Sequence, residues 1–265
     1  MSLASPPLKP LPHWSQSAAG QYALAWQSGC YERLHVDIFG YYALQISALP
    51  PGALDALAAS RITHRWHARP SLPLLPEAHA LDLIAQPQQL PVAENSLDAL
   101  VLPHVLEESP APHAALQEAA RALIPQGHLL LSGFTRTSLW SLPWNKRTRA
   151  ALQLPPQHTL QSPTQLAAQL SALGLQVQSL QYGCWQGLHA AGNYPNHAPS
   201  ERWGRRLYPR LGACYMLHAV KQIVNPRLMP APWLADIPSP AAQPTAPAAL
   251  GQVPNHLPAT PAEQL

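Results

Sequence analysis

Two short apolar runs on either side of a helix-forming segment constrain the fold of this chain more than any other feature. Residues 98–102 read DALVL and residues 128–132 read HLLLS, a composition typical of strands buried on both faces of a sheet. Between the two runs, apolar residues recur at i, i+4 and i+7, which predicts a helix with one buried stripe over residues 110–124. A strand, a helix and a parallel strand in this order form a right-handed β-α-β unit.

Turn and cap residues mark the ends of this helix and of a second one. Pro125 is expected to end the first helix, because proline interrupts helical hydrogen bonding. The second helix is predicted from SPTQLAAQLSALG, with Ser162 as N-cap, Pro163 at the first position and Gln165 completing a capping box. Gly174 stands where a glycine commonly follows a helix in the left-handed conformation.

Further apolar runs between turn residues extend the pattern to a series of strands. These predicted strands cover residues 41–46, 62–67, 80–84, 175–182 and 213–220. Several β-α-β units in series indicate an α/β fold built on a doubly wound, mostly parallel sheet. Ligands bind such sheets at the carboxyl ends of the strands, so we expect the site in the loops at 47–52, 85–91 and 103–109.

Prolines separate a globular centre from two irregular ends. The chain has 265 residues, of which 32 are proline and only 11% are charged. Residues 1–13 are expected to form a loose proline-rich arm, and residues 14–225 a single folded domain. Residues 226–265 carry ten prolines among alanine, glutamine and threonine. They can bury too little apolar surface to offset the entropy of ordering, so we predict a disordered tail, with a polyproline II ligand as the alternative.

Charge, cysteine usage and hydropathy argue against several classes of protein. A net charge of +3 does not by itself imply a nucleic-acid partner. The three cysteines, Cys30, Cys184 and Cys214, include no CxxC pair, and the 13 histidines have no ligand spacing, so we expect no metal site. No run approaches about 18 consecutive apolar residues and no signal peptide is evident, so we expect no membrane span and a cytoplasmic location.

The segment from Leu90 to Phe134 resembles the class I S-adenosylmethionine-dependent methyltransferases of the type 11 group. The residues that carry the resemblance are Leu90-Pro91, Leu97-Asp98, His104-Val105-Leu106-Glu107 and Leu123-Ile124-Pro125-Gln126-Gly127. The runs GYYALQIS, SGFTRTSLWSL and RRLYPRLGACYMLHAVKQ are similar to those of a bacterial subgroup, here with a degenerate glycine loop. The resemblance spans residues 14–225. It implies a Rossmann-like, seven-stranded sheet whose last strand, 213–220, is antiparallel, and S-adenosyl-L-methionine as the cofactor.

The resemblance places the cofactor over the turn that follows the first predicted strand. The family has an acidic residue and then Gly-x-Gly-x-Gly there; in this chain Gln45 takes the acidic position, Ser47 the first glycine and Leu49 the second. Gln45 keeps its hydrogen-bonding capacity without the charge, and Ser47 and Ala48 are small, so these three residues are predicted cofactor contacts. Leu49 has to turn away from the ligand. The alternative is a turn that only joins the strand to a helix formed by ALDALAAS, residues 53–60.

Two further loops complete the predicted cofactor contacts. Gln86 takes the position at which the family has an aspartate for the adenine amino group, and its side-chain carbonyl can accept the same hydrogen bond. Leu102, Pro103 and His104 end the fourth predicted strand, where their backbone would lie beside the methyl group. His104 is the candidate catalytic residue, as a general base or to orient the acceptor; the alternative is a histidine that fixes the local turn. At the end of the second strand, Trp66 and His67 offer no carboxylate for the ribose hydroxyls.

The predicted function is an S-adenosylmethionine-dependent methyltransferase that acts on an unidentified acceptor. The segment 143–161 lies where this class often binds its acceptor, and Trp140, Trp144 and Arg147 could line that side. Methyl transfer depends mainly on positioning, so the absence of an obvious catalytic triad is no objection. The altered glycine and acid positions support the alternative, a catalytically inactive methyltransferase-like protein with a binding or scaffolding role.

A basic stretch near the end of the domain supports a third hypothesis. Trp203 and Tyr208 are interleaved there with basic residues, and such a combination can contact a nucleic-acid backbone and stack on its bases. The basic residues are Arg202, Arg205, Arg206, Arg210, Lys221 and Arg227. A solvated basic helix ahead of the last strand explains the same residues and is preferred, because the overall charge is low.

Overall fold

The structure is a computed structural model of the chain. It describes residues 14–50, 52–70, 83–156, 159–189, 194 and 199–222, apart from the side chains of residues 144 and 151. The predicted arm at 1–13, the predicted tail at 226–265 and the first residues of the strand expected at 80–84 lie outside the described residues. The boundaries of the folded domain therefore stay a prediction.

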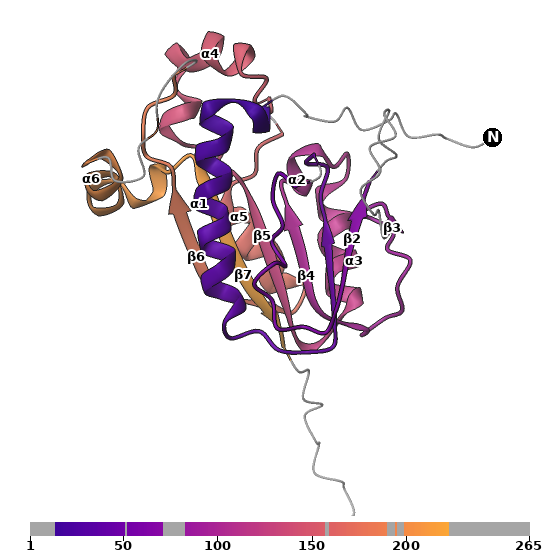
Figure 1. Ribbon diagram of the computed structural model, residues 1–265. Helices are drawn as coiled ribbons and strands as arrows, with labels where there is room; N and C mark the ends of the chain where they lie inside the picture. The colour runs from indigo at the N-terminus through magenta and orange to yellow at the C-terminus, as the bar shows by residue number, and fades with distance from the viewer. Residues whose placement is uncertain are drawn as a thin grey trace, which may run out of the picture. The chain divides into compact units, whose positions relative to one another are not determined.

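The described strands form one seven-stranded sheet in the order β3-β2-β1-β4-β5-β7-β6 (Figure 1). They are β1 (Tyr42–Ile46), β2 (His64–Arg69), β3 (Leu83–Ile84), β4 (Leu97–Pro103), β5 (Leu123–Phe134), β6 (Leu175–Gly183) and β7 (Cys214–Lys221). The pairs from β3 across to β5 are parallel, whereas β7 runs antiparallel to both of its neighbours, β5 and β6. This topology confirms the expected doubly wound sheet and its antiparallel last strand.

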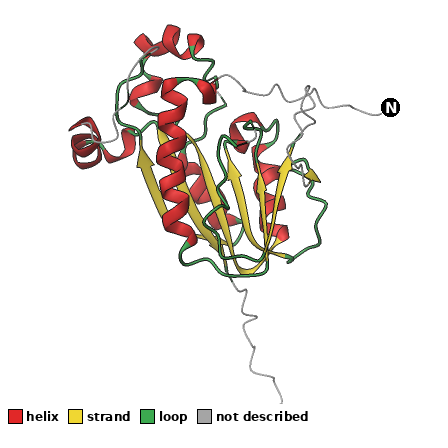
Figure 2. Ribbon diagram, in the orientation of Figure 1, coloured by secondary structure: helices red, strands yellow, loops and turns green. Residues whose placement is uncertain are grey.

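Helices cover both faces of the sheet (Figure 2). The long helix α1 (Ala18–His35) packs on one face, and α3 (Pro112–Ala122) and α5 (Pro163–Ala172) pack on the other. Successive residues of a strand point to opposite faces, so Val101 joins the core beneath α1 while Leu100 joins the core beneath α3. The short helices are η1 (Trp14–Gln16), α2 (Val105–Glu108), η2 (Leu139–Ser141), η3 (Pro143–Asn145), α4 (Lys146–Ala151), α6 (Pro199–Leu207) and η4 (Pro209–Leu211).

The helix predicted over residues 110–124 is shorter than expected, and the strand after it is longer. α3 ends at Ala122 and β5 begins at Leu123, so Pro125 lies within the strand and does not end the helix. The pairing between β4 and β5 shifts register at this point, and Gln126 has a φ of 68°. A bulge of this kind tolerates the proline, which has no N–H to donate to the sheet.

Helix α5 has the predicted ends but lacks the predicted capping box. Ser162 is the N-cap residue, Pro163 is the first helical residue, and Gly174 has the left-handed φ of 78°. The Ser162 hydroxyl makes no capping bond and instead lies 2.9 Å from the hydroxyl of Thr164. The prediction of a box with Gln165 is therefore wrong.

Residues 53–60 form turns, so the helix predicted for this stretch is also wrong. The Gln45 amide donates to the carbonyl of Leu54 at 2.9 Å and accepts from the N–H of Ala56 at 2.8 Å. The Asp55 carboxylate accepts from the N–H of Leu57 at 3.0 Å. These side chains occupy backbone groups that a helix would need for its own hydrogen bonds.

Two histidines pair across the antiparallel part of the sheet. Nδ1 of His128 in β5 lies 2.9 Å from Nε2 of His218 in β7. Burial lowers the pKa of both imidazoles, and His128 and His35 lower that of His218 further, from 6.5 to about 4. The folded protein thus holds this pair neutral.

We expect the contribution of His218 to the free energy of unfolding to be lost as the pH falls from about 6.5 to about 4, while Glu108, whose pKa is raised to about 8, contributes in the opposite direction. The unfolded chain protonates His218 below pH 6.5, whereas the folded chain does so only near pH 4, so the stability present above pH 6.5 is lost in this window. The loss from His218 is about 1–2 kcal/mol once partial exposure is allowed for. Urea unfolding at several pH values measures the slope. The difference in unfolding free energy between the wild type and His218→Gln should change by this amount across the window, whereas the difference for His113→Gln, at an exposed position, should not change.

Candidate functional site

The turn after β1 is held closed by its own hydrogen bonds. The Ser47 hydroxyl accepts from the N–H of Leu49 at 3.1 Å, and the Arg69 guanidinium donates to the carbonyl of Leu49 at 2.8 Å. Gln45 is 3% exposed, and both its side-chain N–H and its side-chain oxygen are hydrogen-bonded to the backbone, at Leu54 and Ala56. The structure thus brings Gln45 and Ser47 together at the end of β1, but both polar groups bind the protein itself.

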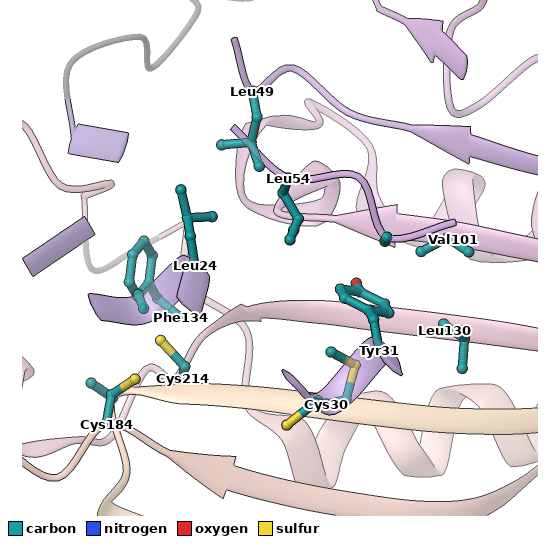
Figure 3. Packing of buried hydrophobic residues seen from close by; sticks show 14 of the residues in the cluster. Leu24, Cys30, Tyr31, Leu49, Leu54, Val101, Leu130, Phe134, Cys184 and Cys214 are labelled. Carbon is teal, nitrogen blue, oxygen red and sulfur yellow. The ribbon is translucent and has the colours of Figure 1, made fainter. Parts of the chain in front are cut away.

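Leu49 points into the protein interior. Its side chain is 4% exposed and belongs to the apolar cluster beneath α1, together with Leu54 from the same loop and Leu24 from the helix. Figure 3 shows Leu49 and Leu54 directed toward α1, which carries Leu24 and Tyr31. The resemblance requires this side chain to turn away from a ligand. In the structure, the side chain lies in the apolar core over this edge of the sheet.

His104 lies at the carboxyl end of β4, where the resemblance places the methyl group. It is the N-cap residue of α2, has the left-handed φ of 57°, and is 2% exposed. Its Nδ1 lies 3.1 Å from Oε2 of Glu107, and its Nε2 lies within 3.1 Å of the side-chain amide of Gln27 in α1. A neutral imidazole that donates from Nδ1 to the carboxylate accepts at Nε2 from the amide N–H.

Two aromatic rings enclose this histidine. The Trp14 ring centroid lies 4.6 Å from that of His104, and the Phe134 centroid lies 4.8 Å away. Trp14 in η1 is 0% exposed and also meets Phe134 edge-on. Trp14 and Gln27, both from the segment ahead of β1, therefore cover the end of β4 through a ring contact and a side-chain hydrogen bond with His104.

Glu107 links α2 to the end of β5. Its Oε1 accepts from the N–H of Phe134, and a Cβ added to Gly133 would lie 2.6 Å from the same oxygen, so glycine permits the approach. In the sequence, Glu107 stands out only as part of the family-like loop, although the His-x-x-Glu spacing places both side chains on one face of a helical turn. Burial and the neighbouring Glu107 raise the pKa of Glu108 to about 8.

Of the remaining predicted contacts, Gln86 lies apart from this pair. Gln86 is exposed beyond β3, which β2 separates from β1. Ala48 is half-buried in the β1 turn, and Leu102 and Pro103 are buried at the end of β4. The residues that the sequence analysis missed, Trp14 and Gln27, come from the segment ahead of β1, and no local motif marks them.

One carboxylate near the second strand comes from the loop before it. Oδ1 of Asp55 lies 3.8 Å from Nε2 of His67 in β2. The strand itself ends in Arg69, whose guanidinium holds the Leu49 carbonyl. An acid thus lies beside β2, but its place in the chain differs from that in the family.

The expected acceptor side is only partly open. Trp140 is 1% exposed and its indole N–H donates to the carbonyl of Gln186 at 2.7 Å, so its side chain is part of the buried core and does not line an exposed surface. Arg147 in α4 is exposed, and the side chain of residue 144 lies outside the described residues. Within the described ranges, no group of three or more His, Cys, Asp or Glu side chains could hold a metal ion. In the same ranges, no helix is long and apolar enough to cross a membrane.

Comparison with known proteins agrees with the fold. Residues 75–131 match the model of a methyltransferase-domain family. An uncharacterized protein of Escherichia coli, YafS, is 43% identical over 58 residues, which are 22% of this chain and 24% of YafS. The match therefore spans about a quarter of that relative.

Solved structures resemble the chain over most of its length. A SAM-dependent methyltransferase from Thermotoga maritima is 16% identical, with coverage of 76% of this chain and 92% of that chain and a TM-score of 0.54. One from Archaeoglobus fulgidus is 16% identical, with coverage of 74% and 94% and a TM-score of 0.52. A chain of the Haloferax volcanii complex that contains the Trm112 methyltransferase activator is 18% identical, with coverage of 80% and 95% and a TM-score of 0.54. The chain thus has the fold of the class I S-adenosylmethionine-dependent methyltransferases, and its residues 75–131 match a methyltransferase-domain family.

Proposed function

We propose that this domain binds S-adenosyl-L-methionine at the carboxyl ends of β1 and β4 and transfers its methyl group to an acceptor that is still unidentified. The observation that carries the proposal is the His104–Glu107 pair, which lies at the end of β4 in a class I methyltransferase sheet. A buried histidine held by a carboxylate is suited to orient an acceptor or to take its proton. Gln45, Ser47, Ala48 and the Leu102–His104 backbone are the proposed cofactor contacts nearest this pair, and Gln86 is a more distant one.

Cofactor binding at this edge requires the β1 turn to open. The sulfonium and ribose need space beside the turn, and Leu49 fills the region next to Leu24 and Leu54. Withdrawing Leu49 and breaking the Arg69–Leu49 hydrogen bond costs free energy, and this cost weakens the net binding of the cofactor. We therefore propose an affinity in the micromolar range or weaker.

The second candidate is a methyltransferase-like protein without catalytic activity, with a binding or scaffolding role. The specific observation in its favour is that every predicted polar contact of the β1 turn is already used within the protein. Gln45 binds Leu54 and Ala56, and Ser47 binds the N–H of Leu49. In this reading, the His104–Glu107 pair only holds α1 against the end of the sheet.

Titration with S-adenosylhomocysteine, followed by calorimetry and by the melting temperature, separates the two candidates. The enzyme proposal predicts weak binding to the wild type and at least about tenfold tighter binding to Leu49→Ala, because a smaller side chain has to leave the core. Leu54→Ala is the matched control, since it also removes a buried leucine of the same loop but should leave the affinity unchanged.

If neither the wild type nor Leu49→Ala responds to the ligand, the catalytic proposal is wrong and the inactive candidate stands. Where binding is seen, a methyl-release assay on cell extract tests the chemistry. His104→Gln should keep the binding of S-adenosylhomocysteine and lose most of the methyl release, whereas a merely structural histidine would affect both through stability.

A further inference from the structure

Helix α6 rests against Trp185 in the loop after β6. The Trp185 backbone N–H donates to the Glu201 carboxylate at 2.9 Å, and its indole N–H donates to the carbonyl of Tyr208 at 3.0 Å. A Cβ added to Gly204 would lie 2.4 Å from the Trp185 ring, so glycine allows the helix to rest on this ring. Glu201, Gly204 and Tyr208 thus define the inward side of the helix, which lies beyond β6 at the edge of the sheet (Figure 1).

The outward side of α6 is amphipathic. Trp203 and Leu207, four residues apart and therefore on one face, are 63% and 58% exposed. Arg202, Arg205 and Arg206 are exposed on the adjacent face. No residue of the helix is buried, so this combination of apolar and basic side chains contributes little to the core.

The charge on this surface is almost entirely positive. Glu201 is the one acid of the helix, and its carboxylate is directed to Trp185. Among the described residues, none of the ion pairs within 4.0 Å involves an arginine of α6. Arg210, just after the helix, is also exposed and adds to the same positive region.

We propose that α6 docks the protein on a membrane surface that carries anionic lipid headgroups. An exposed tryptophan and leucine beside a row of arginines is the composition of helices that lie in the plane of the membrane interface. The apolar pair would enter the boundary of the acyl chains, and the arginines would meet the phosphates. The aliphatic Leu207 beside Trp203 favours lipid over nucleic acid, because base stacking needs flat rings and gains little from an aliphatic chain. The inference is independent of the proposed catalytic activity.

Co-sedimentation of the full chain with lipid vesicles tests the proposal. We expect binding to vesicles of phosphatidylcholine mixed with phosphatidylglycerol, little binding to phosphatidylcholine alone, and weaker binding as salt is added. The triple change Arg202→Gln, Arg205→Gln and Arg206→Gln should weaken binding by about a hundredfold, since each arginine near an anionic surface contributes about fivefold. The pair Trp203→Ser and Leu207→Ser should weaken it by about tenfold or more.

The matched control is the pair Tyr41→Ser and Arg61→Gln, an exposed aromatic and an exposed arginine near the amino ends of β1 and β2. This control should bind the anionic vesicles like the wild type. The proposal is overturned if the wild type does not sediment with anionic vesicles, or if the α6 variants bind as well as the control. It is also overturned if the arginines of α6 are needed for binding a single-stranded oligonucleotide while vesicles are not bound, which would assign the helix to nucleic acid.

Discussion

Trp14→Ala is expected to lower the free energy of unfolding by about 3–5 kcal/mol, the range for removal of a fully buried large aromatic side chain. Trp14 is 0% exposed and its ring contacts both His104 and Phe134. The backbone of η1 already packs closely against α1, since a Cβ added to Gly20 would lie 1.9 Å from the carbonyl oxygen of Trp14. The backbone therefore has little room to move into the cavity left by the indole ring. Urea unfolding followed by far-ultraviolet circular dichroism measures the loss.

Trp14→Phe is the matched control for this change. Among the residues that the structure describes, the indole N–H of Trp14 has no hydrogen-bond partner, so phenylalanine removes an unsatisfied group while it keeps most of the ring contact. We expect this variant to cost under about 1.5 kcal/mol. Equal losses for the two variants would mean that the contact with His104 and Phe134 does not hold the segment ahead of β1 in place.

The architecture could be predicted from local patterns and from the resemblance. The strand at 98–102 and the strand at 128–132 lie side by side as β4 and β5, and the antiparallel last strand follows the family. Such features depend on periodicity and on turn residues that are close in sequence. One error, the helix predicted for residues 53–60, arises because a side chain outside the stretch overrides local propensity, as Gln45 does when it binds Leu54 and Ala56.

The candidate site could be predicted only in part. His104 was identified from its position after a strand, and its partner Glu107 is three residues away, within reach of a spacing argument. Gln27 lies 77 positions from His104, and nothing in either local sequence indicates the contact. The same holds for Trp14, whose place over His104 follows from how α1 packs on the sheet. The sequence singles out Leu49 as the residue of the β1 turn that a ligand would have to avoid, but its inward direction is set by Arg69 and by the apolar cluster, which only the structure shows.

Glu107→Leu is expected to cost about 2–6 kcal/mol, because two buried donors lose their acceptor at about 1–3 kcal/mol each. Leucine has nearly the same volume, so the loss comes from hydrogen bonds rather than from a cavity. The N–H of Phe134 and Nδ1 of His104 would both stay buried without an acceptor. Chemical unfolding at neutral pH gives the magnitude.

Glu107→Gln separates the hydrogen bonds from the charge. Its amide oxygen can still accept from the N–H of Phe134, while its NH₂ group would face Nδ1 of His104. The imidazole of His104 can change to the tautomer with its proton on Nε2 and accept from this NH₂ group at Nδ1, because the side-chain oxygen of Gln27 lies 3.1 Å from Nε2 and can accept its hydrogen bond. We therefore expect a cost under about 1.5 kcal/mol, together with a changed tautomer in the ¹⁵N chemical shifts of the imidazole. A large loss for Glu107→Gln without a tautomer change would mean that the negative charge itself, rather than hydrogen-bond geometry, holds the end of β4 against α1.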